Sequence, residues 1–165
     1  MRQAQLHPGL QVVVPVASGL PRELVSAPFE DSGVSRILID GQAPETIGAC
    51  DVAVVASGTA TLEAALMHRP LVAVYRVSPL TWLVGRALVK IPFVCLVNLL
   101  ANRRVVPELL QGDATATAIV AALEPLWSGP ARTELLNGLD EVRSKLGPPG
   151  AAGRAAEVVL KLTAR

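Results

Sequence analysis

The sequence is poor in aromatic residues and carries almost no net charge. Phe, Trp and Tyr make up 3% of the 165 residues, and the formal net charge is +1. A chain without a basic excess creates no long-range field that attracts nucleic acid, and no arginine-rich stripe with interleaved aromatics is present. Nucleic acid is therefore not an expected partner.

Cysteine is scarce as well. Cys50 and Cys95 have neither a CxxC partner nor the spacing of metal ligands. We expect two reduced, buried thiols in a cytosolic protein, with no metal and no cofactor. The first residues lack the apolar core of a signal peptide, and no uninterrupted apolar run is long enough to span a bilayer. The sequence thus predicts a soluble or peripheral protein.

What the chain has in quantity is apolar residues. They make up 51% of the sequence against 18% charged residues, and the mean hydropathy is +0.45. Such a composition is typical of sheets that are covered on both faces, as parallel sheets are. The length fits one ordinary domain.

Strand and helix patterns alternate along the first hundred residues. Apolar runs bounded by Gly, Pro, Asp or Asn predict strands at residues 10–16, 36–39, 52–55, 71–75 and 94–97. Helical patterns lie at residues 22–27, 44–50, 59–68 and 79–90, and after Asn98 at 103–111, 114–124 with Asp113 as N-cap, 130–146 and 151–162. The prediction is an α/β fold with a Rossmann-like, mostly parallel sheet flanked by helices and an all-helical C-terminal tail.

The stretch from Asp51 to Leu66 predicts a phosphate site. An apolar strand runs into Ser57, Gly58 and Thr59, and a helix starts there. Glycine lets the backbone approach a ligand, and the free N–H groups of a helix start bind anions. Glu63 follows Thr59 by four residues and shares its helical face, where a carboxylate is suited to the hydroxyls of a ribose. Phosphate and diol together indicate a nucleotide.

Ligands of open α/β sheets bind beyond the carboxyl ends of the strands. The expected fourth strand ends at Tyr75 and Arg76, and the expected fifth ends at Asn98. Arginine pairs with phosphate, and the other two side chains form hydrogen bonds. Neither GxGxxG after the first strand nor GxxxxGK is present, which argues against a dinucleotide fingerprint and a P-loop. No Ser, His and carboxylate arrangement marks a catalytic triad.

Four segments together resemble lipid-A-disaccharide synthase. They are SGTATLEAAL, AVYR, PLTWLVGRALVKIPFVCLVNLLA and VVPELLQ, and they follow the order and spacing of that family. The resemblance implies the C-terminal, UDP-sugar-binding half of a GT-B glycosyltransferase, a hexosyltransferase of lipopolysaccharide synthesis in Gram-negative bacteria. Such an enzyme joins UDP-diacylglucosamine to lipid X to give lipid A disaccharide and UDP. The implied location is cytoplasmic, peripheral on the inner membrane, and the implied assembly is a homodimer.

The resemblance also implies site residues. The UDP-sugar site would contain Ser57, Gly58, Thr59, Glu63, Tyr75, Arg76, Asn98, Glu108 and Gln111. Two features of relatives have no counterpart here, a glycine-serine-arginine loop and the acceptor-binding N-terminal half. We therefore expect residues 1–165 to form a single, N-terminally truncated domain that is inactive alone. No catalytic base is assigned among these residues.

The segment after Arg76 offers a membrane contact. Drawn as a helix, it places Trp82, Arg86, Lys90 and Phe93 away from the apolar stripe. Aromatic and basic residues together suit an anionic membrane surface, and the alternative is packing on another protein surface. Two other functions stay open. One is a different UDP-sugar enzyme, such as the peptidoglycan lipid-intermediate transferase or a UDP-sugar epimerase, and the other is a non-catalytic nucleotide-binding half-domain.

Overall fold

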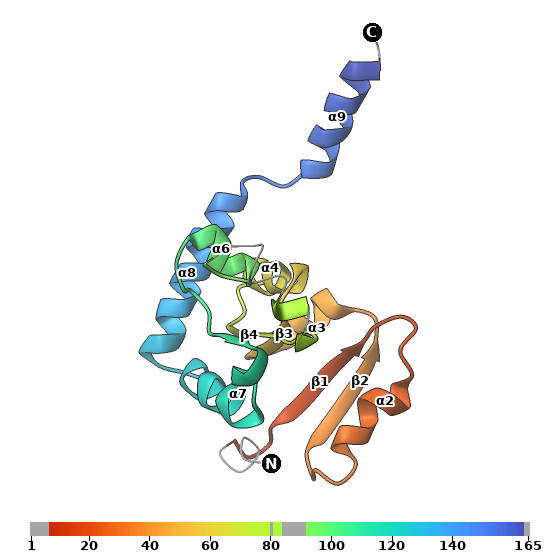
Figure 1. Ribbon diagram of the computed structural model, residues 1–165, viewed down its shortest axis with the longest axis vertical. Helices are drawn as coiled ribbons and strands as arrows, with labels where there is room; N and C mark the ends of the chain where they lie inside the picture. The colour runs from red at the N-terminus through yellow and green to blue at the C-terminus, as the bar shows by residue number, and fades with distance from the viewer. Residues whose placement is uncertain (1–6, 80, 84–91, 164–165) are drawn as a thin grey trace.

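The first half of the chain alternates strands with helices, as the sequence predicts (Figure 1). The structure is a computed structural model, and it describes residues 7–79, 81–83 and 92–163. The alternating elements are β1 (Gln11–Val16), α2 (Arg22–Ser26), the single turn η1 (Ala27–Phe29), β2 (Ser35–Asp40), α3 (Ala43–Ala49), β3 (Ala53–Ala56), α4 (Thr59–Leu66) and β4 (Leu71–Tyr75).

The second half is mainly helical. Residues 79 and 81–83 are helical, and the rest of the predicted helix at 79–90 lies outside the described residues. There follow α6 (Leu96–Ala101), β5 (Glu108–Leu110), η2 (Gln111–Asp113), α7 (Ala116–Leu123), η3 (Glu124–Leu126), α8 (Pro130–Leu146) and α9 (Ala151–Thr163). Proline at the start of α8 and glycine after its end explain its limits, which match the prediction.

In the part of the chain that the structure describes, all strand pairs are parallel, and they form two sheets. β1 pairs with β2, and β4 lies between β3 and β5, so that Ala73 aligns with Val55 on one side and Glu108 on the other. Parallel neighbours require crossover connections, which the intervening helices supply. The predicted fold class, parallel sheet flanked by helices with a helical tail, is confirmed, although the strands divide into a two-stranded and a three-stranded sheet.

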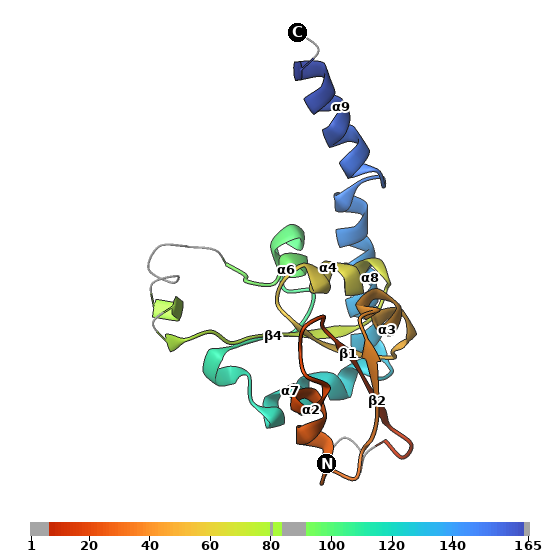
Figure 2. The same cartoon turned by 90° about the vertical axis from the view of Figure 1, so that its right-hand side faces the viewer.

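The core surrounds β4. Leu71, Val72 and Ala73 are completely buried, because α4 and α6 lie on one side of this strand and α7 on the other (Figure 2). Leu139 and Val142 of α8 add to the same core. The central strand of the three-stranded sheet is thus buried over its first three residues, and its carboxyl end, at Tyr75, is half-buried.

The predicted strand at 94–97 and helix at 103–111 are wrong. Residues 94 and 95 are bends, α6 begins at Leu96, and the fifth strand is Glu108–Leu110. The cause lies in two backbone amides. The N–H groups of Val94 and Cys95, the two residues before α6, donate to the Glu108 carboxylate and are therefore not available to a strand ladder.

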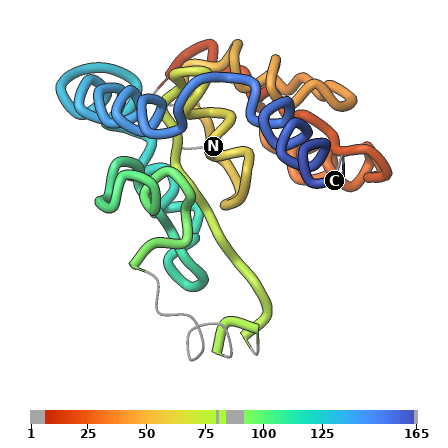
Figure 3. The backbone as a smooth tube through the Cα atoms, turned by 90° about the horizontal axis from the view of Figure 1, so that it is seen from above, coloured from red at the N-terminus to blue at the C-terminus, as the bar shows by residue number. Residues whose placement is uncertain are grey.

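In the helical part, the predicted N-cap of α7 is wrong, and the predicted last helix is correct. Asp113 is not the N-cap of α7, because Thr115 occupies that position and its hydroxyl oxygen accepts a hydrogen bond from the Ala118 N–H at 3.2 Å. The last helix is confirmed within one residue. Figure 3 shows α8 and α9 as two separate rods, and all residues of α9 are exposed.

Candidate functional site

The turn between β3 and α4 is built on the backbone of Gly58. The Ser57 N–H donates to the Val74 carbonyl at 2.8 Å, so the pairing of β3 with β4 continues into the turn. Gly58 then adopts φ 156° and ψ −160°, a region that is almost restricted to glycine. A β-carbon at this position would meet no atom within 4 Å. Glycine is therefore required by the conformation, and the space beside it is open.

The start of α4 presents free amide donors. Thr61 anchors the turn, since its N–H and its hydroxyl both donate to the Gly58 carbonyl, at 3.2 and 2.6 Å. The N–H groups of Thr59 and Ala60 have no acceptor among the described residues. First-turn amides with the positive end of the helix dipole favour an anion, and a phosphate oxygen would satisfy them.

Glu63 stands one turn further along α4. It is half-buried, and its carboxylate forms no hydrogen bond or ion pair with the residues that the structure describes. A partly buried carboxylate without a partner is costly unless a ligand supplies donors. Hydroxyl groups are such donors, whereas a phosphate would repel it.

The carboxyl ends of β4 and β5 lie beside this turn. Tyr75 ends β4 and is half-buried, and Arg76 follows it, exposed and without a partner in the described part of the chain. Gln111 follows the end of β5, and its Oε1 accepts a hydrogen bond from the Val77 N–H at 3.0 Å. The polar groups of all three strand ends are thus brought to one edge. The group from the fifth strand is Gln111, and the expectation that Asn98 ends that strand is wrong.

Asn98 lies instead inside α6, where it is completely buried. Its Oδ1 accepts hydrogen bonds from the N–H groups of Val105 and Val106 at 2.8 and 2.9 Å, and its Nδ2 donates to the Val106 carbonyl at 3.0 Å. The side chain therefore holds the segment before β5. Pattern reasoning missed this role because a bond between residues seven or eight apart in a loop has no periodicity.

Glu108 is the first residue of β5 and not part of a helix start. Its Oε1 accepts hydrogen bonds from the N–H groups of Val94 and Cys95 at 2.7 and 2.6 Å, and Asn98 Nδ2 lies 3.4 Å from its Oε2. The Val94 carbonyl in turn accepts a hydrogen bond from Ser57 Oγ at 3.2 Å. The bend at 92–95 is thereby fixed between Glu108 and the Gly58 turn.

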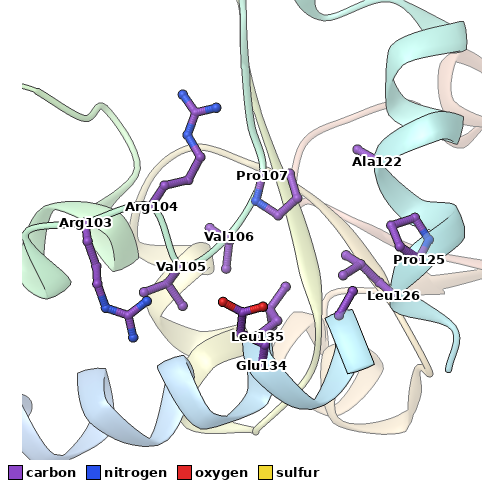
Figure 4. A pocket seen from close by; sticks show the side chains of 11 residues that line it. Arg103, Arg104, Val105, Val106, Pro107, Ala122, Pro125, Leu126, Glu134 and Leu135 are labelled. Atoms are coloured by element: carbon purple, nitrogen blue, oxygen red, sulfur yellow. The ribbon is translucent and has the colours of Figure 1, made fainter. Parts of the chain in front are cut away.

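A separate pocket of about 440 Å³ lies at the amino end of β5 (Figure 4). Pro107 and Leu126 form part of its wall, and Arg104 and Glu134 lie at its margin. Because β5 runs away from Pro107 toward Gln111, this pocket is at the opposite end of the sheet from the Gly58 turn. Arg104 and Glu134 form no ion pair with any described residue, and they serve as controls for the charged side chains of the candidate site.

The thiols behave as small apolar groups. Cys95 is buried, whereas Cys50 is half-buried, so the expectation of two buried thiols is correct only for Cys95. Burial raises the pKa of both Cys50 and Cys95 above the ordinary thiol value. Within residues 7–79, 81–83 and 92–163, no cluster of three His, Cys, Asp or Glu side chains could hold a metal ion.

The predicted membrane contact is described only in part. Trp82 and Phe93 are half-buried, and Arg86 and Lys90 lie outside the described residues. Leu83, next to Trp82, is 67% exposed. Of the helices that the structure describes, none combines the length and the apolar character needed to cross a bilayer.

Comparisons with known proteins agree on one family. The family described as Lipid-A-disaccharide synthetase matches residues 2–143. The chain is 59% identical over 157 residues to the lipid-A-disaccharide synthase of Myxococcus xanthus (strain DK1622), covering 94% of this chain and 41% of that protein. It is 49% identical over 156 residues to the synthase of Anaeromyxobacter sp. (strain K), covering 93% and 41%. It is 44% identical over 162 residues to the synthase of Pseudomonas putida (strain KT2440), covering 98% of this chain and 42% of that protein.

Proposed function

Because the chain belongs to the lipid-A-disaccharide synthase family, we propose that it forms the UDP-sugar-binding part of a glycosyltransferase of lipid A biosynthesis. The chain spans about two fifths of the length of the relatives that it matches. The proposed substrates of the whole enzyme are UDP-diacylglucosamine and lipid X, and the acceptor would bind to a part of the enzyme that residues 1–165 do not include.

One observation carries the proposal. The first amides of α4, Glu63 and Arg76 have no partner in the part of the chain that the structure describes, and they lie at the same edge of one parallel sheet. The amides of Thr59 and Ala60 together with Arg76 would bind the diphosphate, and Glu63 would accept hydrogen bonds from the ribose hydroxyls. Tyr75 and Gln111 would complete the wall of the site.

The proposed chemistry is an inverting transfer. The acceptor oxygen of lipid X forms a bond to the anomeric carbon of the donor sugar, the bond from that carbon to the UDP oxygen breaks, and a base takes the acceptor proton. Negative charge grows on the β-phosphate as UDP departs. The amide donors at the start of α4 and the Arg76 guanidinium would stabilise that charge. Residues 1–165 would thus act on the leaving group, and none of the site residues is assigned as the base.

Calorimetric titration of the chain with UDP and ADP tests the proposal. We expect tighter binding of UDP, and Glu63→Ala should weaken it by about 1–3 kcal/mol through lost hydroxyl contacts. Arg76→Ala should weaken it by a similar amount, on the order of 1.5–3 kcal/mol for a charge-assisted hydrogen bond.

Matched controls lie at the other end of the sheet. Glu134→Ala and Arg104→Ala remove the same charges from the margin of the pocket before β5 (Figure 4). Both should leave UDP affinity unchanged. Equal affinity for ADP and UDP would favour the alternative of a nucleotide-binding module without this specificity. Equal losses of UDP affinity in the control and site variants would show that the affinity depends only on net charge.

We further propose that the segment around Trp82 contacts an anionic membrane, and that the chain forms a homodimer. The exposed Leu83 beside Trp82 supports the first proposal, since an apolar side chain there is free to enter a lipid interface. Co-sedimentation with vesicles of acidic lipids should fall in a Trp82→Ala/Arg86→Ala variant. Unchanged binding would contradict the membrane contact, and a monomer in analytical ultracentrifugation would contradict the dimer.

A further inference from the structure

Asn98 uses its whole hydrogen-bonding capacity inside the protein. An amide side chain has two donor hydrogens and two acceptor positions. Nδ2 lies within hydrogen-bond distance of the Val106 carbonyl and of Glu108 Oε2, and Oδ1 receives the N–H groups of Val105 and Val106. The side chain is also completely buried. A ligand could bind to Asn98 only by breaking bonds that would leave buried backbone groups unpaired.

Glu108 also uses its carboxylate for hydrogen bonds within the protein. One carboxylate oxygen receives two consecutive amides, those of Val94 and Cys95, at 2.7 and 2.6 Å. Charge-assisted bonds of this kind are about twice as strong as neutral ones. The negative charge also stands at the start of α6, where the helix dipole favours it. Its position is therefore set by the protein and does not depend on a ligand.

Glu108 is connected to the Gly58 turn through the peptide unit between Val94 and Cys95. The N–H of this unit, which belongs to Cys95, donates to Glu108, and its carbonyl, which belongs to Val94, accepts the Ser57 hydroxyl, so both sides of the unit are held. Ser57 precedes Gly58, whose carbonyl fixes Thr61 at the start of α4. A displacement of Val94 would thus release the Ser57 side chain at the edge of the turn.

We propose that Asn98 and Glu108 are positioning residues of the UDP-sugar site, which hold the 92–95 bend against Ser57 and do not touch the ligand. The inference rests on the proposed function and refines it. It divides the polar residues near the site into two groups. Among the described residues Arg76 and Glu63 have no partner and are available to a ligand, whereas Glu108 acts through the amides of Val94 and Cys95. Asn98 acts one step further away, through its contact with Glu108 Oε2 and its bonds to the backbone of residues 105–106.

Hydrogen exchange of the ligand-free chain tests the positioning itself. In Glu108→Ala, the amides of Val94 and Cys95 should exchange about tenfold faster or more, because their acceptor is gone. Glu108→Gln keeps one oxygen acceptor and should restore most of the protection. The amides of β4 report on folding and should be unchanged in both variants. Unaltered exchange at Val94 and Cys95 would overturn the inference.

Ligand titration distinguishes positioning from contact. Glu108→Ala should weaken UDP and UDP-acetylglucosamine by the same factor, about three- to tenfold, and Glu108→Gln should recover most of it. A loss confined to the ligand with a sugar would mean that Glu108 contacts the sugar. In a Ser57→Ala background, Glu108→Ala should have little further effect, since the connection is already broken. Full additivity would rule out the route through Ser57.

The outcomes separate this inference from the function on which it rests. Failure of the unsubstituted chain to bind UDP would overturn the proposed function, and the exchange measurement would still decide whether Glu108 fixes the bend. Binding of UDP together with unaffected exchange in Glu108→Ala would leave the proposed function standing and overturn the positioning role.

Discussion

Gly138 of α8 lies directly against Val105, so that a β-carbon at position 138 would come within 2.5 Å of Val105 Cγ1. Real β-carbons do not approach other atoms so closely. A glycine inside a helix costs about 1 kcal/mol relative to alanine, and this contact explains its presence. Val105 also donates its N–H to Asn98, so the contact helps to place the segment that leads into β5.

The contact between Gly138 and Val105 should be sensitive to any side chain at position 138. Gly138→Ala should lower the free energy of unfolding by about 1–3 kcal/mol, because Val105 has a short side chain that cannot move aside easily. Urea denaturation measures the effect. Gly153→Ala, in the exposed helix α9, is the control and should be neutral or slightly stabilising. Addition of Val105→Ala should relieve part of the Gly138→Ala loss, and a Gly138→Ala protein of normal stability would refute the contact.

Thr115 caps the start of α7, whereas Asp113 does not. Thr115→Ala should destabilise the chain by about 1 kcal/mol, since the Ala118 N–H loses its acceptor at the helix start. Asp113→Ala should change the stability by less than about 0.5 kcal/mol, because Asp113 is exposed and caps nothing among the described residues. Thermal denaturation of both variants compares them. The reverse order would restore Asp113 as the N-cap.

Glu141 makes the free energy of unfolding depend on pH in the acid range. Its hydrogen bonds with Lys145 and then Arg103 lower the pKa of this carboxyl group from its ordinary value of 4.5. A carboxylate whose pKa is lower in the folded state stabilises it fully above the ordinary pKa, and the contribution is lost as the pH falls through the lowered value. Glu141→Gln should therefore reduce the difference in urea midpoint between pH 7 and acid pH. Glu134→Gln is the control, and an equal reduction there would exclude a specific role of Glu141.

The thiols should differ in their reaction with Ellman's reagent. Burial raises the pKa of Cys95 and reduces its reactive thiolate, and the closed surroundings exclude the reagent. In a Cys50→Ala chain, Cys95 should react only as fast as the protein opens, and in Cys95→Ala the half-buried Cys50 should react faster. Immediate modification of Cys95 in the folded chain would contradict its burial.

The α/β part of the fold was predictable because each element carries a local signal. The strands around Val55 and Val72 are apolar runs between turn residues, and the Gly58 turn before α4 is set by three adjacent residues. These signals need no information from distant parts of the chain. For the same reason Gly58, Glu63 and Arg76 were found at one sheet edge, since parallel strands bring their carboxyl ends together.

The region from Val94 to Gln111 could not be predicted in this way. Val94 and Val97 favour a strand by composition, yet the carboxylate of Glu108, fourteen residues from Val94, takes the amides that a strand would need. The buried Asn98 makes a second connection of this kind. Side-chain bonds to distant backbone groups override local preference and have no period in the sequence. Gln111 was therefore identified by resemblance and not by its place after β5.

The donors at the start of α4 belong to the main chain. Substitutions at Thr59 or Ala60 change the surface around the anion position without removing its N–H groups, as long as Gly58 keeps its conformation. In the proposed site, recognition of hydroxyls would depend instead on single side chains such as Glu63. One or two replacements would then be enough to change which sugar or nucleoside is accepted, while the main-chain N–H groups would still bind the phosphate.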